Sequence, residues 1–201
     1  MCTIQSETDI PVNLTKADIN KLIEIGKQLQ KEAIAGSKSS TYYYPDKYFQ
    51  NVEPWKDYEM ETCGETIGEK GCALTSFTML ASLHNSTDDP GDVNVTMGDD
   101  ACDFDWIAGE INYNLEQYHY GNSTLDEEDA EYAIAGILED DVCVVGMTYS
   151  GGTHYVLARA YYMTLNEVGI YIYDPASRDY SKLQDYFDDG YVVNRLIYYL
   201  D

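Results

Sequence analysis

The chain changes its residue pattern once, near residue 142, and this change constrains the fold more than any other feature of the sequence. Before that point, apolar residues recur at helical spacing. After it come four runs rich in β-branched and aromatic residues, over 142–149, 155–162, 168–173 and 191–200. Such runs, separated by Gly, Asn and Asp, are typical of strands. Helices followed by a set of strands indicate an α+β fold.

The earlier part of the chain predicts helices that differ in how much of their surface is apolar. Thr15-Lys16-Ala17-Asp18 has the form of a capping box, and an amphipathic helix follows it to about Gly36. Residues 72–83 are apolar almost all round, so we expect a helix buried at the centre of its lobe. A second capping box at 124–127 precedes the apolar stripe of a third helix over 130–138. Shorter helices are expected after Pro90 and from Trp106 to Tyr113, and the stretches 37–45 and 50–71 are interpreted as irregular.

Charge excludes several classes of partner. The 201 residues include 12 Lys and Arg against 36 Asp and Glu, a net charge of −24. Such a surface repels phosphate backbones and anionic headgroups, so we expect neither nucleic acid nor a membrane surface as a partner. No apolar run approaches the roughly 18 residues that a membrane span needs, so we expect no membrane insertion.

The five cysteines do not form the pattern of a disulfide framework, because their number is odd. No Cys-x-x-Cys pair occurs, which argues against a structural zinc site. Cys143 lies in an apolar run and is interpreted as a core residue. Cys63 and Cys102 could pair, but the sequence does not decide it. Seven aspartates between residues 88 and 105 lack the spacing of an EF-hand, so we expect a solvated acidic face and no metal or other cofactor.

Three short stretches carry the residues that could perform chemistry. Cys72 opens the buried helix, His154 lies where a glycine loop enters a strand, and Asp174 lies where another strand ends in a turn. A helix N-terminus favours a thiolate, and an imidazole can take the thiol proton. A carboxylate can then fix the tautomer and the orientation of that imidazole. Each residue alone is typical of ordinary structure, but the order Cys, His, Asp at element ends favours one shared site.

The segment from Tyr48 to the end resembles papain-like cysteine peptidases, most closely the bacterial branch of double-glycine (bacteriocin-leader) peptidases and staphopains. The residues that carry the resemblance are Tyr48-Phe49-Gln50 with Pro54-Trp55, the segment 66–76 (TIGEKGCALTS) with Met79, Gly152-Thr153-His154-Tyr155-Val156, and Tyr173-Asp174-Pro175-Ala176.

The resemblance implies a helical lobe that packs on an antiparallel half-barrel, with the active site in a cleft between them. It implies that Cys72 is the nucleophile, His154 the general base and acid, and Asp174 the orienting residue. Compact relatives carry an oxyanion glutamine about six residues before the nucleophile, where this chain has Thr66. Longer-looped relatives carry it shortly before a Pro-Trp pair, and on that pattern Gln50 takes the oxyanion role.

The domain organisation expected from this resemblance is an N-terminal helical extension over 1–45 and a peptidase domain over 46–201. The peptidase domain would divide into a helical lobe over 46–140 and a strand lobe over 141–201. Eight of the 12 basic residues precede residue 71, so a nearly neutral segment lies ahead of an acidic body. Its amphipathic helix must bury its apolar stripe, and one place to do so is over the cleft, like a pro-segment.

The expected function is that of a cysteine peptidase that hydrolyses amide bonds of a peptide or protein through a thioester. Two alternatives stay open: a latent or non-catalytic peptidase-like binding module, and a cell-wall peptide amidohydrolase. The N-terminus shows no signal-peptide pattern, so we expect either a cytoplasmic chain or a module of a longer secreted protein. The resemblance favours a secreted or cell-surface bacterial setting with further modules as partners.

Overall fold

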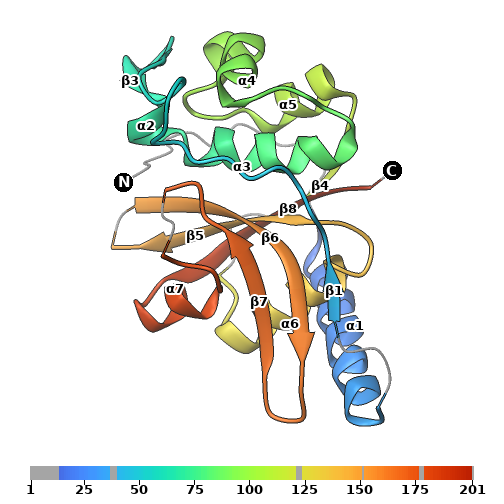
Figure 1. Ribbon diagram of the computed structural model, residues 1–201. Helices are drawn as coiled ribbons and strands as arrows, with labels where there is room; N and C mark the ends of the chain where they lie inside the picture. The colour runs from blue at the N-terminus through green and yellow to red at the C-terminus, as the bar shows by residue number, and fades with distance from the viewer. Residues whose placement is uncertain (1–13, 37–39, 121–123, 151, 177–178, 201) are drawn as a thin grey trace.

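One antiparallel sheet separates two groups of helices in the computed structural model (Figure 1). The structure describes residues 14–36, 40–120, 124–150, 152–176 and 179–200. Its strands are β1 (Ser40–Tyr42), β4 (Glu116–Tyr120), β5 (Cys143–Tyr149), β6 (Gly152–Met163), β7 (Val168–Tyr173) and β8 (Val192–Leu200), with a small separate pair of β2 (Glu59–Met60) and β3 (Glu65–Thr66). The α+β class predicted from the sequence is therefore confirmed, including all four of the late strands.

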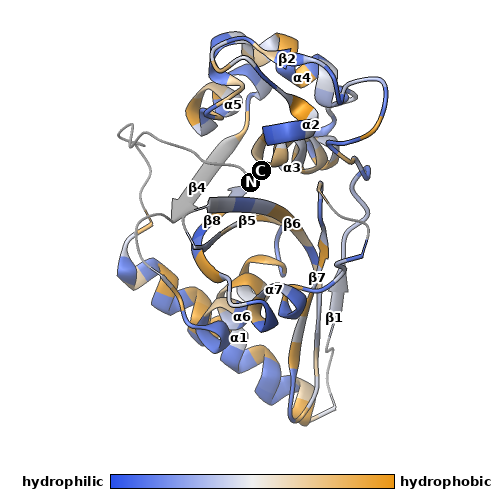
Figure 2. Ribbon diagram, turned by 90° about the vertical axis from the view of Figure 1, so that its left-hand side faces the viewer, coloured by the Kyte–Doolittle hydropathy of each residue, from blue (hydrophilic) through white to orange (hydrophobic). Residues whose placement is uncertain are grey.

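Strand β6 is the longest described strand and pairs with three others, β1, β5 and β7. The order along the sheet is β1-β6-β5-β8-β4, and β7 pairs with the other edge of β6. The first half of β6 pairs with β5, from Gly152 opposite Tyr149 to Ala158 opposite Cys143. Its second half pairs with β1, which thus continues the edge that β5 leaves. The sheet curls around α6 and α7, as Figure 2 shows.

Alternation along the strands gives the sheet two buried faces. On one face the core includes Tyr155 and Leu157, and it is covered by α2 (Ile67–Lys70), α3 (Cys72–Ala81), α4 (Pro90–Met97) and α5 (Trp106–Tyr113). On the other face the core includes Val156 and Ala158, and it is covered by α1 (Lys16–Ile34), α6 (Glu127–Ile137) and α7 (Gln184–Asp188). Two short 3-10 turns, η1 (Ser82–His84) and η2 (Gly98–Asp100), follow α3 and α4 directly.

Helix α6 does not belong to the lobe in which the sequence placed it. It packs on the far face of the sheet against α1, so the segment 46–140 is not one helical lobe. The two helices approach closely. A Cβ on Gly26 would lie 2.2 Å from the carbonyl oxygen of Tyr132, and a Cβ on Gly136 would lie 2.7 Å from the carbonyl oxygen of Leu22. Only glycine permits this contact between backbones.

Helix α1 therefore buries its apolar stripe against α6 rather than over the start of α3. Its residues Ile19 and Ile23 belong to the lower core, and the strand β1 that follows joins the main sheet. Residues 14–36 and 40–45 are thus part of the domain and not a separate cover. Residues 1–13, the rest of the proposed extension, lie outside the described residues.

A disulfide joins Cys63, in the β2–β3 turn, to Cys102, which follows η2. It closes a loop with a sequence separation of 39 that contains α2, α3 and α4. Within the described residues, no helix is both long enough and apolar enough to cross a membrane.

Candidate active site

The helix α3 presents its first residue, Cys72, at the boundary between the upper helices and the sheet. All ten residues of α3 are buried, as the sequence predicted, and Cys72 is 1% exposed. Helix α2 runs directly into α3 through Gly71, where a Cβ would lie 2.6 Å from the carbonyl oxygen of Ile67. Gly71 precedes the first turn of α3, so the first backbone N–H groups of this helix lie beside the thiol. These donors favour a thiolate and could hold an oxyanion.

His154 and Asp174 form a direct hydrogen-bonded pair. The Nε2 atom of His154 lies 3.0 Å from Oδ1 of Asp174, and the two side chains are 15% and 0% exposed. Strand β6 supplies the histidine near its start, and Asp174 follows the last residue of the neighbouring strand β7. The sequence therefore identified two residues, 20 positions apart, that do meet.

The Asp174 carboxylate accepts two further hydrogen bonds. The backbone N–H of Ala176 donates to Oδ1 over 2.8 Å, and the hydroxyl of Tyr186 in α7 donates to Oδ2 over 2.5 Å. Burial by itself would raise the pKa of Asp174, but the donors and the His154 ring outweigh it and hold that pKa below its usual value. Asp174 therefore stays a carboxylate although no solvent reaches it.

The same contacts explain the state of Tyr186. Burial raises the pKa of Tyr186 far above its usual value, and the charge of Asp174 adds to this rise. Its hydroxyl therefore remains a donor, and its ring also lies against that of His154, at 5.4 Å between centroids. No local pattern indicated Tyr186, because its place in the site depends on α7, which was not predicted.

The contact with Asp174 decides which nitrogen of His154 can react. When Nε2 carries the proton that is donated to Asp174, Nδ1 is left as the basic nitrogen. Helix α3 packs on β6, and Cys72 shares one buried cluster with Tyr155, the residue that follows His154. Figure 1 shows the start of α3 and the start of β6 at the same side of the molecule. The imidazole is thus held through Nε2 at the start of β6, while Tyr155, whose side chain lies in the cluster of Cys72, faces the opposite side of the strand.

Gln50 links the two halves of this arrangement. Its backbone N–H donates to the carbonyl of Pro175 over 2.9 Å, directly after Asp174. Its side-chain Nε2 donates to the carbonyl of Gly68 over 3.1 Å, in the helix that leads into Cys72. The side chain is buried, and the Oε1 atom has no hydrogen-bond partner within the described residues. Gln50 therefore spans the gap between the Asp-Pro turn and the nucleophile helix.

The residues around Gln50 fix its position. The indole Nε1 of Trp55 donates to the carbonyl of Phe49 over 2.7 Å, and Asn51 Nδ2 donates to the carbonyl of Ala176 over 3.3 Å. Thr66, the alternative position for an oxyanion side chain, starts α2, where its backbone N–H donates to Glu69. Thr66 therefore has a structural role at a helix start.

The acidic run between residues 88 and 105 is partly structural. Asp89 caps α4 by accepting from the N–H groups of Gly91 and Asp92, and Asp105 caps α5. Within the described part of the chain, no group of three or more His, Cys, Asp or Glu side chains is arranged to hold a metal ion.

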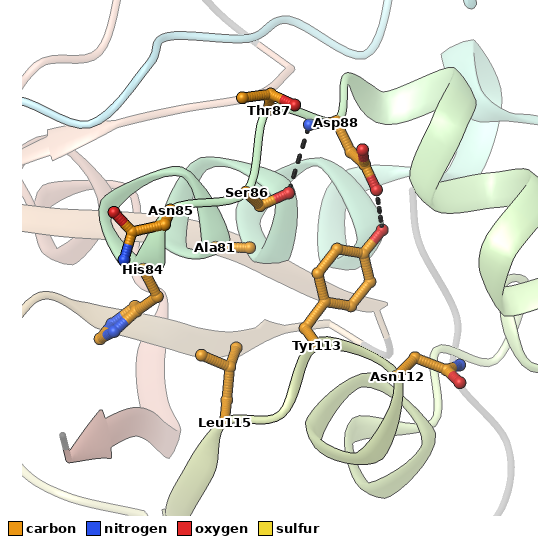
Figure 3. Close-up of a pocket in the computed structure, with 9 residues that line it drawn as sticks. All are labelled: Ala81, His84, Asn85, Ser86, Thr87, Asp88, Asn112, Tyr113 and Leu115. Carbon is orange, nitrogen blue, oxygen red and sulfur yellow. Dashed lines mark hydrogen bonds between the residues drawn. The ribbon is translucent and has the colours of Figure 1, made fainter.

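A cavity of about 330 Å³ lies at the other end of α3, away from Cys72 (Figure 3). Its walls include Ser86, Asn112 and Tyr113, and the Tyr113 hydroxyl donates to Asp88 over 2.8 Å. His84 lies at its edge, with Nε2 2.9 Å from Oδ2 of Asp141. This contact joins η1 to the residues just before β5 and is a structural tie. The cavity lining presents hydroxyl, amide, carboxylate and imidazole groups, and its lining residues include no cysteine.

Comparison with known proteins adds no assignment. No protein-family model, no curated protein and no solved structure matches the chain significantly. The residues of the site and their geometry are therefore the basis for assigning a function.

Proposed function

We propose that the chain is a papain-like cysteine peptidase, with Cys72 as nucleophile, His154 as general base and acid, Asp174 as the orienting residue and Gln50 as an oxyanion donor. The observation that supports this most directly is the buried His154–Asp174 pair with its Nε2 contact of 3.0 Å. A histidine held in this way by a carboxylate keeps one tautomer and one orientation. The upper helices and the curled sheet would be the two lobes of such an enzyme.

In the proposed reaction, Nδ1 of His154 takes the proton of the Cys72 thiol, and the sulfur attacks the carbonyl carbon of an amide bond. The backbone N–H of Cys72 and the Nε2 group of Gln50 stabilise the negative charge that develops on the carbonyl oxygen. Collapse of this intermediate breaks the C–N bond, and His154 gives its proton to the leaving amine. A thioester remains on Cys72.

Water completes the cycle. His154 accepts a proton from the water as its oxygen attacks the thioester carbonyl, and the C–S bond then breaks. The acid product leaves and the sulfur of Cys72 regains a proton from His154. Asp174 remains ionised throughout and stabilises the imidazolium form of His154.

The experiment that tests this proposal measures thiol reactivity. Cys2→Ser protein is treated with iodoacetamide between pH 5 and 9, and each cysteine is followed by peptide mass mapping. We expect Cys72 to react well below pH 8 and to lose this reactivity in His154→Ala, because the imidazole stabilises the thiolate. Cys143 is an internal control, since burial raises the pKa of its thiol far above the usual value. Equal and slow labelling of Cys72 in both proteins would contradict the proposal.

A second candidate function is a latent form of the same enzyme, and the 1% exposure of Cys72 favours it. Its test is peptide hydrolysis before and after deletion of residues 2–13, a cut that stops short of the core residue Ile19. A gain in hydrolysis, with unchanged circular dichroism, would support latency. No gain would contradict latency and favour an enzyme whose site is not covered by these residues. A separate assay with cell-wall peptides and with casein would distinguish a cell-wall peptide amidohydrolase from a protein peptidase.

We further propose that the protein acts outside the reducing cytoplasm, in a secreted or cell-surface setting. The Cys63–Cys102 disulfide supports this, because such bonds persist mainly in oxidising compartments.

A further inference from the structure

Two cationic side chains contact one aromatic ring beside the proposed active site. The Nζ atom of Lys47 lies 4.9 Å from the ring centroid of Tyr173, and Cζ of Arg159 lies 4.5 Å from it. Lys47 also lies 5.0 Å from the ring of Phe49. Cation–π contacts of this kind are favourable, but two positive charges that share a ring repel each other.

These cations have no carboxylate partner in the described part of the chain, although the protein carries 36 acidic residues. Neither Lys47 nor Arg159 forms an ion pair there, whereas Lys27, Lys56 and Lys70 all do. The Nε atom of Arg159 is buried and lacks a hydrogen-bond partner among the same residues. Two unpaired cations at one place are unusual in a chain of net charge −24.

Lys47 and Arg159 are connected to the proposed site in two ways. Tyr173 directly precedes Asp174, and Phe49 directly precedes Gln50. Arg159 lies on β6, five residues after His154, which is about 16 Å at the usual rise of a strand. An extended peptide crosses that distance in about five residues.

We infer that Lys47 and Arg159, which both contact the ring of Tyr173, bind the side-chain carboxylate of a Glu or Asp in the peptide substrate, within about five residues of the bond that is cut. This inference rests on the proposed peptidase function and names the substrate class of the same site. A carboxylate between the two cations would relieve their repulsion and complete the missing ion pairs. A single carboxylate also suits the surroundings better than a polyanion, which the rest of the acidic surface repels.

The test compares matched peptides on the full chain. A fluorogenic series carries Glu at each of five positions on either side of the cleaved bond, and a partner series carries Gln. We expect kcat/KM for the best Glu peptide to exceed that for its Gln partner about five- to tenfold at low salt. The Lys47→Gln variant, whose side chain is exposed, should bring this ratio close to one. Lys21→Gln removes the same charge from the exposed face of α1 and should leave the ratio unchanged.

Equal kcat/KM for Glu and Gln peptides in the wild type would overturn the inference. It would also be overturned if the enzyme preferred peptides with a free C-terminal carboxylate over their C-terminal amides, whether or not they carry Glu. Arg159→Gln is a second variant and should lower the ratio in the same way. If the Arg159→Gln protein does not fold, Lys47→Gln alone decides the test. If no peptide is cut, the proposed peptidase function is contradicted, and the inference about carboxylate binding is then tested separately. Fluorescence anisotropy with labelled Glu and Gln peptides then decides: tighter, Lys47-dependent binding of the Glu peptide supports the inference, and equal binding overturns it.

Discussion

Asp174 accepts three hydrogen bonds while its side chain is excluded from solvent, and this combination organises the proposed site. His154, Tyr186 and the backbone of Ala176 supply the donors. A buried charge without such donors would be strongly destabilising. Because the donors come from β6, α7 and the turn after β7, the carboxylate also joins three separate segments of the chain. Its ionisation should therefore affect the stability of the fold as well as the chemistry.

We expect Asp174→Asn to lower the free energy of unfolding by ~1–3 kcal/mol at pH 7, because charge-assisted hydrogen bonds are lost. The pKa of Asp174 is lower in the folded protein than the ~3.9 of an unfolded chain. Its contribution is therefore fully present above that unfolded value and is lost as the pH falls through the folded pKa. Urea unfolding at pH values from about 2 to 7 measures the difference between wild type and variant. A difference that stays constant down to the lowest pH would contradict the assignment.

At the scale of elements, α1 and α6 meet backbone against backbone. Gly26 and Gly136 let the two backbones meet without a side chain between them. This contact carries the N-terminal helix into the lower core, since Ile19 and Ile23 are buried beside α6. Helix α1 is thus held by packing that a single methyl group would disturb.

We expect Gly26→Ala to destabilise the protein by about 1–3 kcal/mol, because the new Cβ would lie 2.2 Å from the carbonyl oxygen of Tyr132. The higher helix propensity of alanine acts in the opposite direction by about 1 kcal/mol but does not remove a clash with backbone. Urea unfolding measures the change, with the exposed Glu24→Ala of the same helix as control. A stabilised Gly26→Ala variant would show that the helices do not meet as described.

Local patterns predicted the helices and the late strands, and non-local pairing explains what they missed. The Thr15–Asp18 capping box does start α1. The second box was placed wrongly: Leu125 pairs with Val193 and stays extended, so Asp126 caps α6 by accepting from the N–H of Asp129. Strand β1 was interpreted as linker because its partners lie about 120 residues later, at the end of β6.

In the candidate site, too, local patterns predicted some residues, and contacts between distant segments explain the rest. Cys72, His154 and Asp174 stand at element ends, which a sequence pattern can show. The bonds of Gln50 to Gly68 and Pro175 bring together three segments that are far apart in the chain. No local periodicity encodes such a contact.

At the scale of the whole molecule, charge opposes compaction. A net charge of −24 on 201 residues makes the folded state repel itself more than the extended chain does. Few cations are available to offset this, and those of Lys47 and Arg159 lie over an aromatic ring instead of beside carboxylates. Stability should therefore depend on the ionic strength of the solvent.

We expect the Tm to rise by about 2–4 °C when NaCl increases from about 0.01 M to about 0.1 M, the shift that ~1 kcal/mol produces in a domain of this size. The reason is that the Debye length falls from about 30 Å to about 10 Å and screens the repulsion. Differential scanning calorimetry measures it, with an equal osmolality of sucrose as control. A Tm that falls or does not move would show that repulsion is not a significant term.

The chain holds a disulfide at Cys63–Cys102 and a thiol at Cys72 only nine positions from Cys63. These two sulfur states make opposite demands, since conditions that maintain the first tend to oxidise the second. The burial of Cys72, which is 1% exposed, limits the contact of its sulfur with oxidants. A cystine at 63–102 and a reduced thiol at position 72 can therefore persist in one molecule.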